Sequence, residues 1–186
     1  MTYSELYNAL DYVDHSRHKR KEMSSLILNS PSNIPTIMEI AFQVDDPVSC
    51  KACWIMEFTA KEHLPHLFPY MDNFVENIGK VHLDPAVRPV AKICEYLMKS
   101  YFQSKDKKTC ETVKDQHLEG ITSACFDWLI GDHKVAAKAY SMTSLLLLGR
   151  KFDWIHPELR MILEQNYPLG SAAYKARARM TLAKIK

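Results

Sequence analysis

Two cysteines in the stretch "SCKACWIMEF", Cys50 and Cys53, have the C-x-x-C spacing that occurs at redox sites and at zinc sites. Disulfide oxidoreductases place this spacing after a strand, at a helix N-terminus that lowers the pKa of one thiol. Many zinc sites use it as half of their ligand set, and His63 and His66 follow downstream. No strand pattern precedes the pair, and a continuing helix would carry His63 well over ~10 Å away. The spacing therefore predicts neither a redox site nor a metal site, and no cofactor is expected.

The same stretch has the pattern of a helix with one apolar face and an opposite face that carries the thiols. Val48, Ala52 and Ile55 fall on one apolar face, and the two thiols fall on the opposite face beside Glu57. We therefore expect Cys50 and Cys53 to lie apart from the apolar anchor face, on the side of the helix that meets a partner. The pattern leaves open whether the thiols are exposed there or packed at a seam between repeats.

A repeat of about 40 residues surrounds this helix. Its units share an Asp or Ser, an apolar anchor, and an Ala four residues after the anchor. The anchor pairs are Val48 with Ala52, Val87 with Ala91, Val135 with Ala139, and Tyr174 with Ala178. The anchors are 39, 48 and 39 residues apart, and the polar insert 103–111 accounts for the longer interval. Further helical patterns precede the units at 33–44, 64–81, 112–130 and 153–167, and 3–13 with 17–29 form a less regular first pair.

Local signals support this arrangement. The Asp or Ser ahead of each unit, at positions 46, 84, 132 and 171, is typical of a helix N-cap. Pro69 lies inside a helical pattern and should kink or restart it. The pattern predicts one all-α domain over residues 1–186, a right-handed α-α superhelix of about five helical pairs.

Composition favours a reduced, water-exposed environment. Hydrophobic residues make up 47% of the chain and charged residues 25%, and the longest purely apolar run is Leu145–Leu148, too short to span a bilayer. The start of the chain lacks the pattern of a signal peptide, and five cysteines form no evident disulfide framework. These features predict a cytoplasmic protein without membrane contact.

Charge is spread unevenly along the chain. The whole chain has a net charge of +2, but residues 134–186 carry +7 and the rest −5. A basic C-terminal third suggests an acidic protein surface, nucleic acid or phosphate as the partner.

The D-P-V…A units, in "VDDPVSCKACWIMEF" and "KVHLDPAVRPVAKICE", resemble HEAT repeats. More narrowly, these runs resemble short bacterial HEAT-like proteins often labelled adenylosuccinate lyase. That activity would need a Gly-Ser-Ser loop followed by Met-Pro-x-Lys, whereas Gly170-Ser171 leads into "AAYKAR". No catalytic residue is therefore carried over from the label, and lyase activity remains only an alternative.

Inner-face positions of the repeat units combine basic residues with tyrosines. We expect a non-enzymatic scaffold that binds an acidic peptide or protein there. The expected binding residues are Arg88, Lys92, Tyr96, Lys138, Tyr140, Arg177 and Arg179. The alternative is a nucleic-acid-binding relative of the HEAT-like alkylpurine DNA glycosylases, with Glu57, Trp54 and Tyr96 in loosely similar chemical roles, although the paired arginines of that family are missing.

Overall fold

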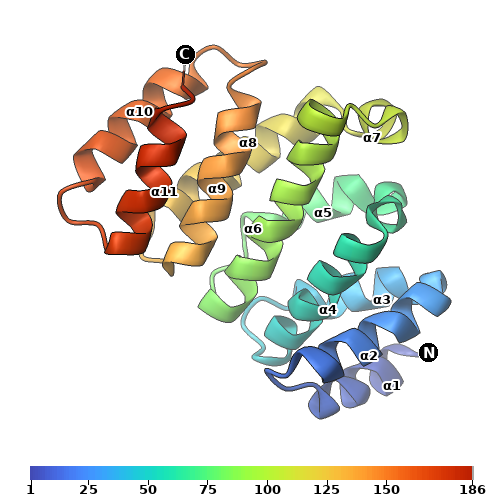
Figure 1. Ribbon diagram of the computed structural model, residues 1–186. Coiled ribbons are helices and arrows are strands. Elements are labelled where there is room, and N and C mark those ends of the chain that lie inside the picture. The colour runs from blue at the N-terminus through green and yellow to red at the C-terminus, as the bar shows by residue number, and fades with distance from the viewer. Residues whose placement is uncertain (186) are drawn as a thin grey trace.

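The computed structural model describes residues 1–185, which contain eleven α-helices and no β-strand (Figure 1). The helices are α1 (Tyr3–Ala9), α2 (Arg17–Asn29), α3 (Ile34–Ala41), α4 (Val48–Glu62), α5 (Met71–Ile78), α6 (Asp84–Lys99), α7 (Lys107–Thr112), α8 (Asp115–Ile130), α9 (Val135–Leu148), α10 (Ile155–Asn166) and α11 (Ala172–Leu182). The predicted all-α class is confirmed. Within the described residues, no helix combines the length and apolarity needed to cross a bilayer.

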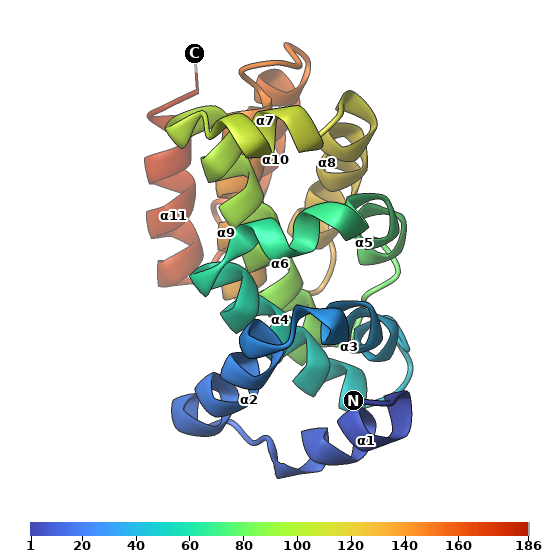
Figure 2. The same ribbon diagram turned by 90° about the vertical axis from the view of Figure 1, so that its right-hand side faces the viewer.

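The helices pack in two layers. Helices α2, α4, α6, α9 and α11 contact one another in chain order and form what we call the inner layer. Helices α1, α3, α5, α8 and α10 lie behind them, with α3 packed on α4 and α8 packed on α9. Figure 2 shows the two layers from the side, with α11 and α2 near one edge and α1, α5 and α8 toward the other. We call the surface of the inner layer that faces away from α1, α3, α5, α8 and α10 the inner face.

Small side chains allow the inner helices to approach closely. Ala52, Ala91 and Ala178, which recur at the same place in each repeat unit, are fully buried, whereas Ala139 is half-buried. The most extensive contact between helices is that of α6 with α9, and α6 also packs extensively on α4. Because close-packed interiors leave no room for larger side chains, these alanines set the spacing of the inner layer.

The predicted helix caps are partly confirmed. Ser171 caps α11 as predicted, because its Oγ accepts a hydrogen bond from the backbone N–H three residues later at 3.3 Å. Asp46 Oδ1 accepts one from the backbone N–H two residues later at 2.9 Å, but the N-cap residue of α4 is Pro47 and not Asp46. The prediction is wrong for Asp84 and Asp132, because α6 begins at Asp84 itself and α9 begins three residues after Asp132. Asp84 instead pairs with His133 Nδ1 at 3.2 Å, which links the starts of two inner helices.

Two segments interrupt the pairing of helices. The segment Leu64–Tyr70 forms a 3-10 helix that ends just before α5, so Pro69 restarts the helix as predicted. The polar insert 103–111 contains part of a π turn and most of the short helix α7. Sequence patterning missed α7 because six residues are too few to show an amphipathic period.

Candidate ligand-binding face

Three cations form a stripe along α6. Arg88, Lys92 and Lys99 are spaced by four and seven residues, which places them within about 40° of one another around the helix axis. We call these three residues the basic stripe. Each side chain is partly exposed, from 20% at Lys92 to 42% at Lys99, so a ligand can reach them.

The buried carboxylate Glu95 holds two members of this stripe. Its side chain is 2% exposed and accepts hydrogen bonds from Lys92 Nζ and, at 2.9 Å, from Lys99 Nζ. Burial by itself raises the pKa of Glu95, but the two lysines outweigh it and the pKa lies below its ordinary value. Glu95 is therefore ionised at neutral pH and fixes the positions of both ammonium groups.

A second buried carboxylate, Glu57 on α4, holds the third member. Arg88 Nη2 donates to Glu57 Oε2 at 2.6 Å, and the Glu57 side chain is 10% exposed. Burial raises the pKa of Glu57 above its ordinary value, although Arg88 acts in the opposite direction. The pKa of Glu57 is raised and that of Glu95 is lowered because Glu57 has one direct cationic donor and Glu95 has two.

Aromatic rings from neighbouring helices surround the stripe. Lys92 Nζ lies 5.1 Å from the ring centre of Tyr96 and 4.3 Å from that of Tyr140 on α9. Burial, with a smaller contribution from Glu57, raises the pKa of Tyr96 to about 12, so its hydroxyl stays protonated. All these partners belong to inner-layer helices, which places the stripe on the inner face.

Arg20 from α2 extends this cluster, and sequence analysis missed it. Its guanidinium lies 5.7 Å from the ring centre of Trp54 and 5.2 Å from that of Phe58. Its Nη2 also donates to the His15 carbonyl at 2.7 Å, which fixes the side chain. Nothing in the run "RHKRK" distinguishes Arg20 from its basic neighbours. Only the packing of α2 against α4 shows which of them reaches the inner face.

The seven predicted binding residues do not all come together. Arg88, Lys92, Tyr96 and Tyr140 form one cluster. Lys138 lines a separate hollow before α11, because two residues along a helix turn it about 200° from Tyr140.

The two predicted residues of α11 also lie outside the cluster. Arg179 lines a hollow between α10 and α11, together with Tyr167 and Leu182. Arg177 is half-buried on α11 and makes no ion pair within residues 1–185.

The two cysteines of C-x-x-C are buried, so the expectation that they face a partner is wrong. Cys50 is 7% exposed, and Cys53 is fully buried with its thiol directed at the Ala41 carbonyl, 3.7 Å away. Helix α4 packs against α2, α3 and α6, which leaves only a narrow strip of it accessible. Burial raises the pKa of both thiols, which is the opposite of what a redox or nucleophilic cysteine needs. In residues 1–185, no three His, Cys, Asp or Glu side chains gather as a metal site would require.

Thiol labelling tests this arrangement directly. Of the five cysteines, all within the described residues, Cys110 is exposed and the other four are buried. Native protein should therefore react rapidly with an aromatic disulfide reagent at one thiol, and denatured protein at five. The variant Cys110→Ser should remove the rapid phase. A rapid phase that survives this change would show that Cys50 or Cys53 is accessible.

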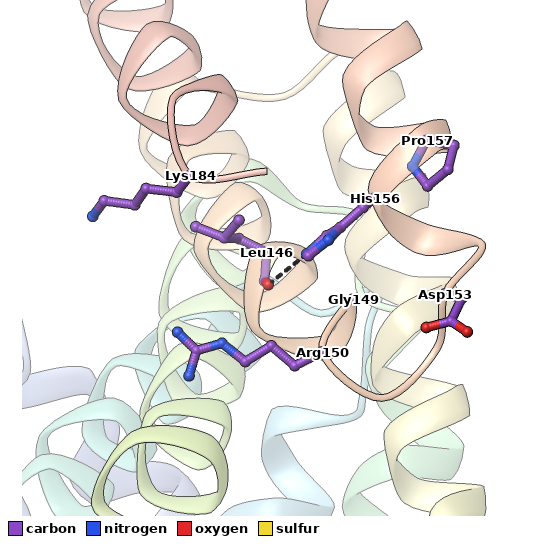
Figure 3. Close-up of a pocket in the computed structure, with 7 residues that line it drawn as sticks. All are labelled: Leu146, Gly149, Arg150, Asp153, His156, Pro157 and Lys184. Atoms are coloured by element: carbon purple, nitrogen blue, oxygen red, sulfur yellow. Dashed lines mark hydrogen bonds between the residues drawn. The ribbon is translucent and has the colours of Figure 1, made fainter. Parts of the chain in front are cut away.

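A further hollow lies where the end of α9, the start of α10 and the segment after α11 meet (Figure 3). It has a volume of about 820 Å³. Its lining comprises Leu146, Gly149, Arg150, Asp153, His156, Pro157 and Lys184. His156 Nε2 bonds to the Leu146 carbonyl at 3.0 Å, and its ring leaves no room for a Cβ at Gly149. Arg150 Nη1 lies 3.4 Å from the Phe102 carbonyl, so this side chain connects the hollow to the segment just beyond the end of α6.

Comparison of the chain with protein-family models, with curated proteins and with solved structures finds no match.

Proposed function

We propose that the chain is a HEAT-like helical-repeat scaffold, without catalytic activity, whose inner face binds an acidic segment of a partner protein. The observation that carries this proposal is the charge balance of the inner-face cluster. Arg20 and the three cations of the basic stripe outnumber the two buried carboxylates, Glu57 and Glu95. A net positive, aromatic-rich surface suits a chain of carboxylates.

The cluster is arranged before any ligand arrives. Glu57 and Glu95 hold Arg88, Lys92 and Lys99 in place while leaving part of each side chain in water. Ordering a flexible lysine or arginine on binding costs about 0.5–1.5 kcal/mol per side chain. Because the protein orders these side chains during folding, a ligand meets less of this cost.

The arrangement of helices supports the repeat interpretation. The inner layer follows chain order, and its fully buried alanines recur at equivalent places. We propose that this layer is a right-handed superhelix of five helical pairs, an architecture whose concave surface binds extended segments. Free thiols at all five cysteines favour a reducing compartment, and we propose the cytoplasm.

A binding measurement tests the proposal. A fluorescein-labelled decapeptide of alternating Asp and Glu should bind at low salt, and its anisotropy should fall as salt is added. Lys99→Met removes an exposed cation of the stripe and should weaken binding about fivefold, the effect of one ion pair worth ~1 kcal/mol.

The matched control is Lys107→Met. Lys107 lies on α7, its side chain is 89% exposed, and its partner Glu111 is also on α7. This variant removes the same charge away from the inner face and should bind like the unchanged protein. Equal weakening by Lys99→Met and Lys107→Met, or no peptide binding at low salt, would contradict the proposal.

One observation favours nucleic acid as a second candidate ligand. Glu57 is a buried acid with a raised pKa that accepts a hydrogen bond from Arg88 and lies near Tyr96, and Trp54 precedes it by three residues on α4. An acid within a basic aromatic face is the chemistry that the HEAT-like alkylpurine DNA glycosylases use. Duplex DNA that binds more tightly than the acidic peptide, with affinity falling linearly in log salt, would favour this candidate.

A further inference from the structure

A second surface lies on the other side of the molecule and has the opposite chemistry. A hollow of about 440 Å³ lies between α8 and the turn that joins α9 to α10. Three aromatic side chains line it, Phe126, Phe152 and Trp154, together with two carboxylates, Glu119 and Asp127. We call it the aromatic hollow.

The side chain of Trp154 is far more exposed than those of the other two tryptophans. Its side chain is 56% exposed, whereas Trp54 and Trp128 are 8% and 2% exposed. Its ring stacks on Phe126 with 5.6 Å between ring centres and 22° between planes. The stack holds the indole at the rim of the hollow, with one side free for a ligand.

The charge of the aromatic hollow is uniformly negative. Within residues 1–185, no basic side chain lines it, and neither Glu119 nor Asp127 forms an ion pair. Seen along α8, both carboxylates project from the same side of the helix as Phe126. Two unneutralised carboxylates beside aromatic rings stand out in a chain of net charge +2.

We propose that the aromatic hollow binds an organic cation, an ammonium or guanidinium group on an apolar stem. The faces of aromatic rings carry negative partial charge and attract such groups, most strongly when the cation is weakly hydrated. Trp154 and Phe126 contact the stem and the cation, and Glu119 and Asp127 supply the countercharge. This proposal is independent of the inner face, because it uses other helices and the opposite ligand charge.

Calorimetric titration with tetramethylammonium chloride tests the proposal, with sodium chloride at equal ionic strength as the reference. Saturable binding of tetramethylammonium, but not of sodium, is expected. Trp154 is the exposed tryptophan, so a parallel titration followed by tryptophan fluorescence should change the long-wavelength part of the emission spectrum. No saturable binding beyond that of sodium would overturn the proposal.

Two variants separate the rings from the carboxylates. Trp154→Leu should lower the affinity at least tenfold, whereas Trp154→Phe keeps a ring and should retain most of it. The double variant Glu119→Gln with Asp127→Asn should lower affinity about tenfold. The control Glu158→Gln removes an acid that does not line the hollow and should have no effect. Unchanged affinity in Trp154→Leu would overturn the assignment.

A second ligand identifies the source of the cation. Nα-acetyl-trimethyl-lysine amide carries the same ammonium group on a protein side chain. Tighter binding of this compound than of tetramethylammonium would support a lysine side chain as the ligand. Equal binding would support a free small amine. Either result supports an ammonium site.

Discussion

Replacing Arg88 by methionine is expected to lower the free energy of unfolding by about 3 kcal/mol at pH 7, the low end for breaking a buried ion pair. Glu57 is 10% exposed and Arg88 is its direct donor at 2.6 Å, so the change leaves a buried carboxylate without its cation. The low end applies because the Arg88 side chain is 31% exposed, and water can enter where it stood. Urea denaturation followed by circular dichroism measures the loss.

The loss should depend on pH in a defined direction. Burial already raises the pKa of Glu57 in the folded protein, and removing Arg88 raises it further. A carboxyl whose folded pKa exceeds its unfolded pKa binds more protons when folded, so stability falls as pH rises through that interval. The deficit of Arg88→Met should therefore be largest above the raised pKa and shrink toward the ordinary carboxyl range.

The double variant Glu57→Gln with Arg88→Met is the control. A neutral amide avoids the cost of the buried charge, so the double variant should be more stable at pH 7 than Arg88→Met alone. Its stability should also lose the pH dependence assigned to Glu57. A double variant no more stable than the single one would show that Arg88 contributes by packing rather than by neutralising Glu57.

Replacing Ala91 by leucine should also cost about 3 kcal/mol of stability, the upper end for overpacking a core. Ala91 is fully buried on α6, the helix with the most extensive contacts to both α4 and α9. Three added carbon atoms must push these helices apart or adopt strained rotamers. Thermal and urea denaturation would both report the loss.

Ala139→Leu is the matched control for this prediction. Ala139 occupies the same place in the next repeat unit, but it is half-buried. A larger side chain can turn toward solvent there, so the change should stay within about 1 kcal/mol. Equal costs at both positions would contradict the idea that the contacts of α6 set the spacing of the inner layer.

Sequence periodicity predicted the helices well because helix formation depends on local pattern. The anchors at Val48, Val87, Val135 and Tyr174 each lie at or near the start of an inner helix. The polar cap at Ser171 could be predicted for the same reason, since a cap bonds within three residues of itself. Periodicity did not predict helix α7, because that helix is too short to show a period.

The candidate site was predictable only along α6 and its nearest neighbour. Arg88, Lys92 and Tyr96 share a face of one helix, and Tyr140 reaches them across the contact of α6 with α9. Lys138 is only two residues from Tyr140, yet it lines another hollow. Positions counted from a repeat anchor locate a residue along a helix, but they do not show which neighbour that residue meets.

The sequence by itself determined that the chain is helical, where most helices begin, and which charges α6 presents along one side. The tertiary structure determined which side chains are buried and which remain exposed. It buried Cys50 and Cys53 among α2, α3 and α6, brought Arg20 onto Trp54, and left Trp154 exposed beside Phe126. The physical reason is one of range. Hydrogen bonds and periodicity act over a few residues, whereas burial depends on helices that lie tens of residues away in the chain.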